Sequence, residues 1–176
     1  MSKKVIALAI LFILVFAVFT TLVVQAEFGT GWTAQYFNNT TLQGTPVYTE
    51  SLPTGINVNW GTGSPNPAVP VDNFTARFTS IQLFNQGTYE FVVSSDDGVR
   101  VLIDNALVWD RFIGRVLTTD RFQLNITAGT HAITVEYLEL VDQAAVQFQY
   151  FQVNVQPGTT PGVVTTPGVV TTPVVT

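Results

Sequence analysis

The chain has 176 residues and no cysteine, and its 7 basic and 12 acidic side chains give a formal net charge of −5. This acidic balance argues against a nucleic-acid partner, whose phosphates require a basic surface. Without cysteine there is no disulfide framework, and the single histidine excludes a zinc site of ordinary composition. Stability must therefore come from an apolar core, with or without a bound metal ion.

Residues 1–26 have the features of a targeting segment. Two lysines precede an almost wholly apolar run over 5–24, and Val24-Gln25-Ala26 offers the small residues that a signal peptidase reads. The run is also about long enough for a membrane span, which needs roughly 20 residues. We expect a signal helix cleaved after Ala26. An uncleaved anchor, which would give the only membrane contact, is the alternative. Either way, residues 27–176 are expected to be secreted or displayed at the cell surface.

Removal of that segment would make the remaining chain more acidic. Both lysines lie within it, so residues 27–176 carry five arginines and 12 acidic residues, a net charge of −7. A negative surface of this kind suits a chain that meets cations or neutral ligands.

Residues 27–155 are predicted to form one β-domain. Apolar and polar residues alternate with a period of two, and turn signals such as Asp97-Gly98 and Ala128-Gly129 separate the runs. One apolar and one polar face per strand is typical of antiparallel sheets packed face to face. The sequence therefore predicts an all-β, antiparallel sandwich or jelly-roll-like fold, with strands over 87–93, 99–104, 120–126, 132–138 and 146–151.

Residues 156–176 differ in composition from the rest of the chain. The unit TTPGVV occurs twice and then once more without its glycine. Regularly spaced proline blocks the hydrogen-bond ladders of a sheet, and such short units cannot bury a core. We expect a disordered Thr/Pro/Val-rich linker or stalk.

The stretch SSDDGVRVLID over 94–104 holds two adjacent carboxylates, Asp96 and Asp97, before Gly98. One interpretation is a β-hairpin whose two-residue turn is Asp97-Gly98, solvated and without metal. That interpretation leaves Asp96 unexplained, because successive side chains of a strand point to opposite faces. The second interpretation is an irregular backbone, such as a cis peptide, that brings both carboxylates to one point. A calcium ion, which takes about 6–8 oxygen ligands, would then lie between them.

Four motifs in order make residues 30–153 similar to the PA14 domain family. They are WTAQYFNNTTLQGTPV, then VNWGTGSPNPAVPVDNFTARF, then GTYEFVVSSDDGVRVLIDNALVWD, and finally LNITAGTHAITVEYLEL. The resemblance implies a β-sandwich but is less specific for function, because one fold hosts many activities. PA14 domains occur in adhesins, glycosidases, proteases and toxins.

The resemblance also implies a metal site. In lectin-like members an adjacent Asp-Asp pair holds calcium through a cis peptide, and the ion accepts sugar hydroxyls, which assigns Asp96 and Asp97 as ligands here. A further oxygen comes from a late loop, here LVDQAA over 140–145, where Gln143 is the first candidate and Asp142 or a backbone carbonyl the next. Trp109 could lie near the ion and contact the ligand, with a packing role as the alternative. The chain lacks the cysteines that brace the yeast members, so their specificity loops cannot be carried over.

These features predict an exported, non-catalytic module that binds carbohydrate or mediates adhesion through a calcium ion held by Asp96 and Asp97. Glycoside hydrolysis needs two carboxyl groups about 5–9 Å apart across a sugar, which adjacent ion-bound aspartates cannot provide. The lone His131 follows a turn and is interpreted as structural. The alternatives are a structural spacer and an accessory domain of a surface enzyme or toxin.

Overall fold

A computed structural model describes residues 31–153. The expected signal segment over 1–26 and the expected tail over 156–176 lie outside the described residues. Ten strands make up the described part: β1 (Trp32–Phe37), β2 (Tyr48–Leu52), β3 (Asn57–Gly61), β4 (Phe74–Phe84), β5 (Gly87–Asp96), β6 (Gly98–Ile103), β7 (Ala106–Arg111), β8 (Thr118–Ile126), β9 (Gly129–Glu139) and β10 (Ala144–Gln152).

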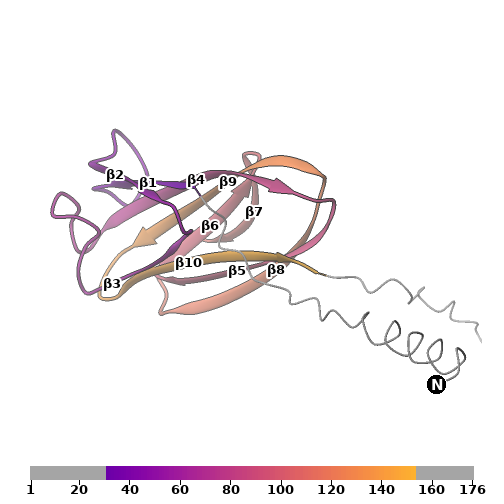
Figure 1. Cartoon of the computed structure of the whole chain (residues 1–176). Coiled ribbons are helices and arrows are strands. Elements are labelled where there is room, and N and C mark those ends of the chain that lie inside the picture. The colour runs from indigo at the N-terminus through magenta and orange to yellow at the C-terminus, as the bar shows by residue number, and fades with distance from the viewer. Residues whose placement is uncertain (1–30, 154–176) are drawn as a thin grey trace, which may run out of the picture.

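The strands form two sheets that face each other (Figure 1). The six-stranded sheet has the order β2-β1-β4-β9-β6-β7, and the four-stranded sheet has the order β3-β10-β5-β8. Every strand pair is antiparallel. The predicted all-β antiparallel sandwich is thus confirmed. Within residues 31–153 there is no helix long and apolar enough to cross a membrane.

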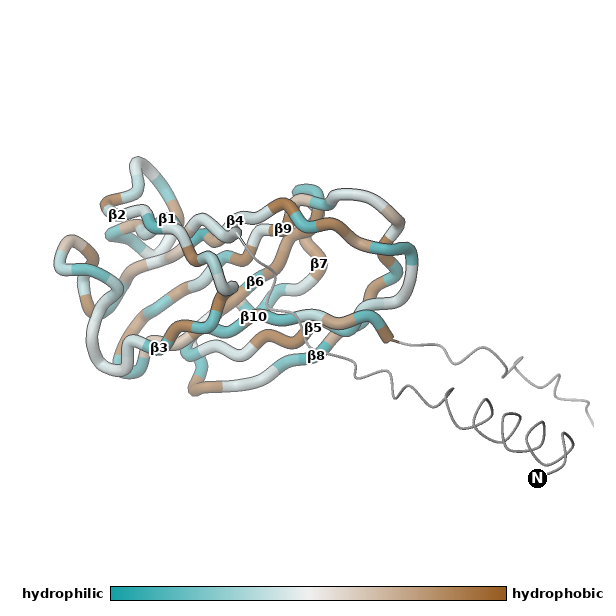
Figure 2. Tube along the Cα trace, viewed as in Figure 1, coloured by the Kyte–Doolittle hydropathy of each residue, from teal (hydrophilic) through white to brown (hydrophobic). Residues whose placement is uncertain are grey.

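The core fills the space between the sheets because each strand turns alternate side chains inward. Figure 2 shows hydrophobic and hydrophilic segments following one another along the strands. Phe91 and Phe148 come from the four-stranded sheet, Phe78 and Val135 from the six-stranded sheet, and all four are fully buried. Trp32 packs edge-on against Phe148 with ring centroids 5.7 Å apart. Each such side chain contributes about 1.5–3 kcal/mol by leaving water, which offsets chain entropy without any disulfide.

The hairpin expected around Asp97-Gly98 is wrong. β5 pairs with β8 and β10, whereas β6 pairs with β7 and β9, so the chain crosses from one sheet to the other at this point. Gly98 serves close packing here and not a turn. A Cβ at Gly98 would lie 2.7 Å from the Ile113 nitrogen and 2.9 Å from its oxygen, which are backbone atoms that cannot swing aside.

Candidate functional site

Asp96 and Asp97 occupy the crossing between the two sheets. Asp96 ends β5, Gly98 begins β6, and the peptide bond between the two aspartates is cis, as the sequence had suggested. Asp96 is half-buried, while Asp97 is only 6% exposed. The pair therefore stands at one end of the sandwich, with one carboxylate near solvent and the other turned inward.

The Asp97 carboxylate joins two loops. Its Oδ1 accepts a hydrogen bond from the Arg115 backbone N–H at 2.9 Å, in the loop between β7 and β8. Its Oδ2 accepts from the backbone N–H groups of Leu140 at 2.8 Å and Val141 at 3.4 Å, between β9 and β10. Both oxygens are thus engaged by backbone donors. Asp97 therefore holds both loops against the crossing.

The Asp96 side chain retains more free acceptor capacity. Its Oδ2 accepts from the Leu117 backbone N–H at 3.1 Å, and its Oδ1 accepts no hydrogen bond from residues 31–153. Burial raises the pKa of Asp96, the Leu117 N–H opposes that rise, and the charges of Asp97 and Asp142 add to it. Asp96 is therefore the carboxylate best placed to gain from an external cation.

A third carboxyl group, Glu139, lies beneath the pair. Its side chain is fully buried, its Oε1 has no hydrogen-bond partner in the described part of the chain, and its Oε2 lies 2.5 Å from the Tyr137 hydroxyl. The same hydroxyl donates to the main-chain oxygen of Asp96. The hydroxyl donates to Glu139 Oε2 as well, and this hydrogen bond lowers the pKa of Glu139, opposing the effect of burial. Burial raises the pKa of Glu139 to about 7, and nearby Asp97 and Asp96 contribute.

Arg115 is the one cationic side chain of residues 31–153 that bonds to the crossing, and it does not neutralise the carboxylates of Asp96 and Asp97. The Arg115 guanidinium contacts the Asp120 carboxylate at 2.5 Å, the Ser95 hydroxyl at 2.7 Å and the main-chain oxygen of Asp97 at 3.3 Å. Among the ion pairs of residues 31–153, none involves Asp96 or Asp97. The crossing therefore keeps an excess of negative charge.

The late loop predicted to complete the site does lie against the pair, through the Leu140 and Val141 N–H bonds. Asp142 is exposed, and its charge is close enough to raise the pKa of Asp96. Gln143 is also exposed, and its Oε1 lies 3.9 Å from the position of a Cβ built on Gly61. The structure thus brings Asp142 toward the pair and turns the Gln143 amide toward β3.

Trp109 is half-buried on β7 and packs between the sheets. Its ring stacks on Phe122 with centroids 4.9 Å apart and planes 2° from parallel, and the Arg111 guanidinium lies 4.7 Å from the ring centroid. These contacts are those of a packing residue, the alternative that the sequence left open. A ligand contact by Trp109 stays a prediction.

A calcium ion at the crossing would find two charged side-chain ligands, Asp96 and Asp97. No group of three or more His, Cys, Asp or Glu side chains in the described part converges on one point. An ion would therefore rest on the carboxylates of Asp96 and Asp97, with carbonyl oxygens and water completing its shell, which the flexible geometry of calcium permits. The unpartnered Glu139 oxygen and the lack of a counter-charge both favour a cation here.

Sequence reasoning missed Glu139, Tyr137 and Arg115 as parts of the site. The signal for Glu139 was its position two residues after Tyr137, which places both on the inward face of one strand. No sequence signal identified Arg115, because its contacts depend on how the loop before β8 folds against the crossing.

The domain is an all-β antiparallel sandwich of two sheets, and an acidic crossing joins one sheet to the other. The PA14 domain family matches residues 29–160, and the chain belongs to that family. It is 26% identical over 135 residues to the anti-sigma-I factor RsgI3 of Acetivibrio thermocellus, a match that covers 76% of this chain and 21% of that protein.

Solved structures agree with this assignment. An anti-sigma factor domain-containing protein superposes with a TM-score of 0.64 and 26% identity, covering 70% of this chain and 43% of the other. A PA14 sugar-binding domain from an RTX adhesin superposes with a TM-score of 0.57 at 15% identity, covering 70% and 90%, and shows likeness of fold alone. The chain thus spans about a fifth of its curated relative and under half of the first of these structures.

Proposed function

We propose that this PA14 domain is an exported, non-catalytic carbohydrate-binding module whose site is the crossing at Asp96 and Asp97. One observation carries the proposal: two carboxylates share this crossing, and no cationic side chain of residues 31–153 pairs with either. The sugar-binding PA14 domain of the RTX adhesin supports the ligand class by analogy of fold.

The residues of the crossing have separate tasks in this proposal. Asp96 and Asp97 would hold a calcium ion, and calcium supplies open coordination positions that vicinal sugar hydroxyls can fill. The N–H bonds to Asp97 fix the loops that flank the ligand, and the Leu117 N–H fixes the orientation of the Asp96 carboxylate. Asp142 adds negative charge at the exposed rim.

The experiment is a glycan array probed with the full-length protein in calcium or in chelator. Binding should be lost in chelator and in Asp96→Asn, and kept in Asp110→Asn, an exposed carboxylate on β7 outside the crossing. Circular dichroism would check that each variant is folded. Glycan binding that persists in chelator and in Asp96→Asn would refute the ion-dependent mechanism. An array without any bound glycan would refute the function.

A second candidate function is ligand recognition on behalf of a regulatory protein. The 26% identity to an anti-sigma-I factor favours it. Such a protein would be expected to keep residues 5–24 as an anchor, whereas a secreted module would lose them. Mass spectrometry of the mature N-terminus decides between the two, because cleavage after Ala26 contradicts the anchored form.

A further inference from the structure

A shallow hollow of about 220 Å³ lies on the outer face of the four-stranded sheet, apart from the aspartate pair itself. Its lining includes side chains from all four strands of that sheet: Asn57 and Asn59 of β3, Gln147 of β10, Ser94 of β5 and Thr119 of β8. All five carry amide or hydroxyl groups, each able to donate and to accept hydrogen bonds.

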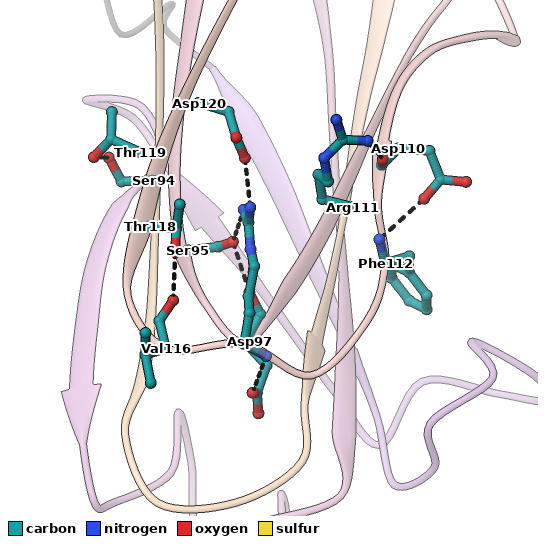
Figure 3. A network of polar contacts seen from close by, with 11 residues as sticks. Ser94, Ser95, Asp97, Asp110, Arg111, Phe112, Val116, Thr118, Thr119 and Asp120 are labelled. Atoms are coloured by element: carbon teal, nitrogen blue, oxygen red, sulfur yellow. Dashed lines mark hydrogen bonds and ion pairs between the residues drawn. The ribbon is translucent and has the colours of Figure 1, made fainter.

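Four of these residues form one continuous rung across the sheet. Gln147 pairs with Asn57 on one side and with Ser94 on the other, and Ser94 pairs with Thr119. The Ser94 and Thr119 hydroxyls lie 2.7 Å apart (Figure 3), and the Gln147 Nε2 donates to the Asn57 Oδ1 at 3.3 Å. These contacts hold the side chains in place and leave the Asn57 amide nitrogen and the Gln147 amide oxygen available to a ligand.

The hollow is continuous with the aspartate crossing. On the next outward-facing rung, Ala145 pairs with Asn59 and with Asp96. Leu117, which lines the hollow, donates its backbone N–H to the Asp96 carboxylate. The small Ala145 side chain keeps the floor low between Asn59 and Asp96. A ligand held at Asp96 can therefore extend over the rung without leaving the sheet surface.

The lining indicates a neutral ligand. None of the residues that line the hollow carries an ionisable side chain, although the chain as a whole is acidic. Leu117 and Ala145 add apolar contacts among the amides and hydroxyls. Alternating hydroxyl and C–H surfaces are the chemistry of a neutral sugar, whereas an anionic polysaccharide or a basic peptide would find no counter-charge in the hollow.

We propose that this hollow is a second subsite that binds the neighbouring residue of a neutral oligosaccharide chain anchored at the aspartate crossing. The proposal rests on the function proposed above. It adds Gln147 and Thr119 as ligand-binding residues, and it makes the ligand a chain and not a single sugar.

The test is calorimetric titration of the full-length protein with neutral gluco-, xylo- and manno-oligosaccharides, each as a length series from monosaccharide to hexasaccharide, in calcium. For the series that binds, the wild type should gain about tenfold or more in affinity beyond the monosaccharide, equivalent to about 1.4 kcal/mol. The Gln147→Ala/Thr119→Ala double variant should lose that gain and keep monosaccharide binding. Ala145→Leu, which raises the floor without adding charge, should lose it too. Thr33→Ala on the opposite sheet is the matched control.

The outcomes separate the two proposals. If calcium-dependent binding of the monosaccharide is seen but affinity does not rise with chain length, the subsite is overturned and the proposed function stands. The subsite is also overturned if the Gln147→Ala/Thr119→Ala and Ala145→Leu variants keep the rise in affinity with chain length. If these variants lose the rise in affinity, but the rise survives chelator and Asp96→Asn, the result supports the subsite and refutes the ion-dependent mechanism. If no series binds, the subsite proposal fails, and the glycan array described above decides whether the proposed function fails with it. Analytical ultracentrifugation then shows whether this face joins two copies of the chain.

Discussion

The carboxylate of Asp97 accepts a hydrogen bond at 2.8 Å from the backbone N–H of Leu140, 43 residues further along the chain. The same carboxylate accepts from Arg115 in another loop, so a single buried side chain fixes two loops at the point where the chain changes sheets. The negative charge of Asp97 is therefore solvated by the protein backbone. Asp96, with a free oxygen nearer solvent, is left as the group that would gain most from a metal ion.

Removing the Asp97 carboxylate should destabilise the fold. Asp97→Ala leaves the N–H groups of Arg115 and Leu140 without their acceptor, and we expect the free energy of unfolding to fall by about 3 kcal/mol, at about 1–3 kcal/mol for each buried unsatisfied group. Asp97→Asn keeps one oxygen and should lose about half as much. Urea denaturation measures both, with exposed Asp110→Ala as the control. An Asp97→Ala midpoint equal to that of the wild type would show that the loops hold without this residue.

A methyl group at Gly98 should be costly. Gly98→Ala places a Cβ within 3.0 Å of two Ile113 backbone atoms, so either β6 or the loop must shift, at a cost of about 1–3 kcal/mol. Gly114→Ala meets the flexible end of Leu140 at 3.0 Å, and should cost less than Gly98→Ala. Thermal unfolding of the two variants ranks them. The reverse order of stability would be inconsistent with the close backbone approach at Gly98.

The far end of the sandwich should contribute stability that depends on pH. His131 Nδ1 lies 2.6 Å from the Asp104 carboxylate, and this hydrogen bond is the main cause that raises the pKa of His131 above its ordinary value of 6.5 and lowers that of Asp104. A raised histidine pKa stabilises the fold below 6.5, and the gain is lost as pH rises through the folded pKa. At acid pH the stabilisation from the His131–Asp104 pair is lost again when the Asp104 carboxylate becomes protonated. The lowered pKa of Asp104 moves this loss to lower pH.

The matching experiment compares the melting temperatures of wild type and His131→Gln across pH. Between the pKa of Asp104 and about pH 6.5, the wild type should exceed the variant by its largest margin, and the margin should narrow in the alkaline range. A margin that grows toward alkaline pH would mean that the neutral imidazole is the stabilising form.

The sequence was sufficient to predict strands β5, β6, β8, β9 and β10, but not the other five strands of residues 31–153 nor the assignment of strands to sheets. Alternation such as Tyr89, Phe91 and Val93 predicts a half-buried strand because side chains repeat every two residues. Nothing local distinguishes a tight hairpin at Asp97-Gly98 from a crossing between sheets. That choice depends on distant partners, such as Ala145 opposite Asp96, whose register no short motif encodes.

The sequence also predicted part of the candidate site, but not the contacts that hold it together. The adjacency of Asp96 and Asp97 stands in the sequence, and the family resemblance indicated the late loop that contacts Asp97. The backbone donors that engage Asp97 could not be foreseen, because every residue except proline has an N–H group and only the folded loops aim three of them at one carboxylate. The hollow over Ala145 was hidden for the same reason, since its rung joins four strands that are far apart along the chain.

The most direct measurement is a calorimetric titration of calcium into the full-length protein, the Asp96→Asn variant and the Asp110→Asn control. The account predicts saturable binding at one site in the wild type and the control, a higher melting temperature in millimolar calcium, and loss of both effects in Asp96→Asn. Absence of calcium binding by the wild type, or equal binding by folded Asp96→Asn, would contradict it.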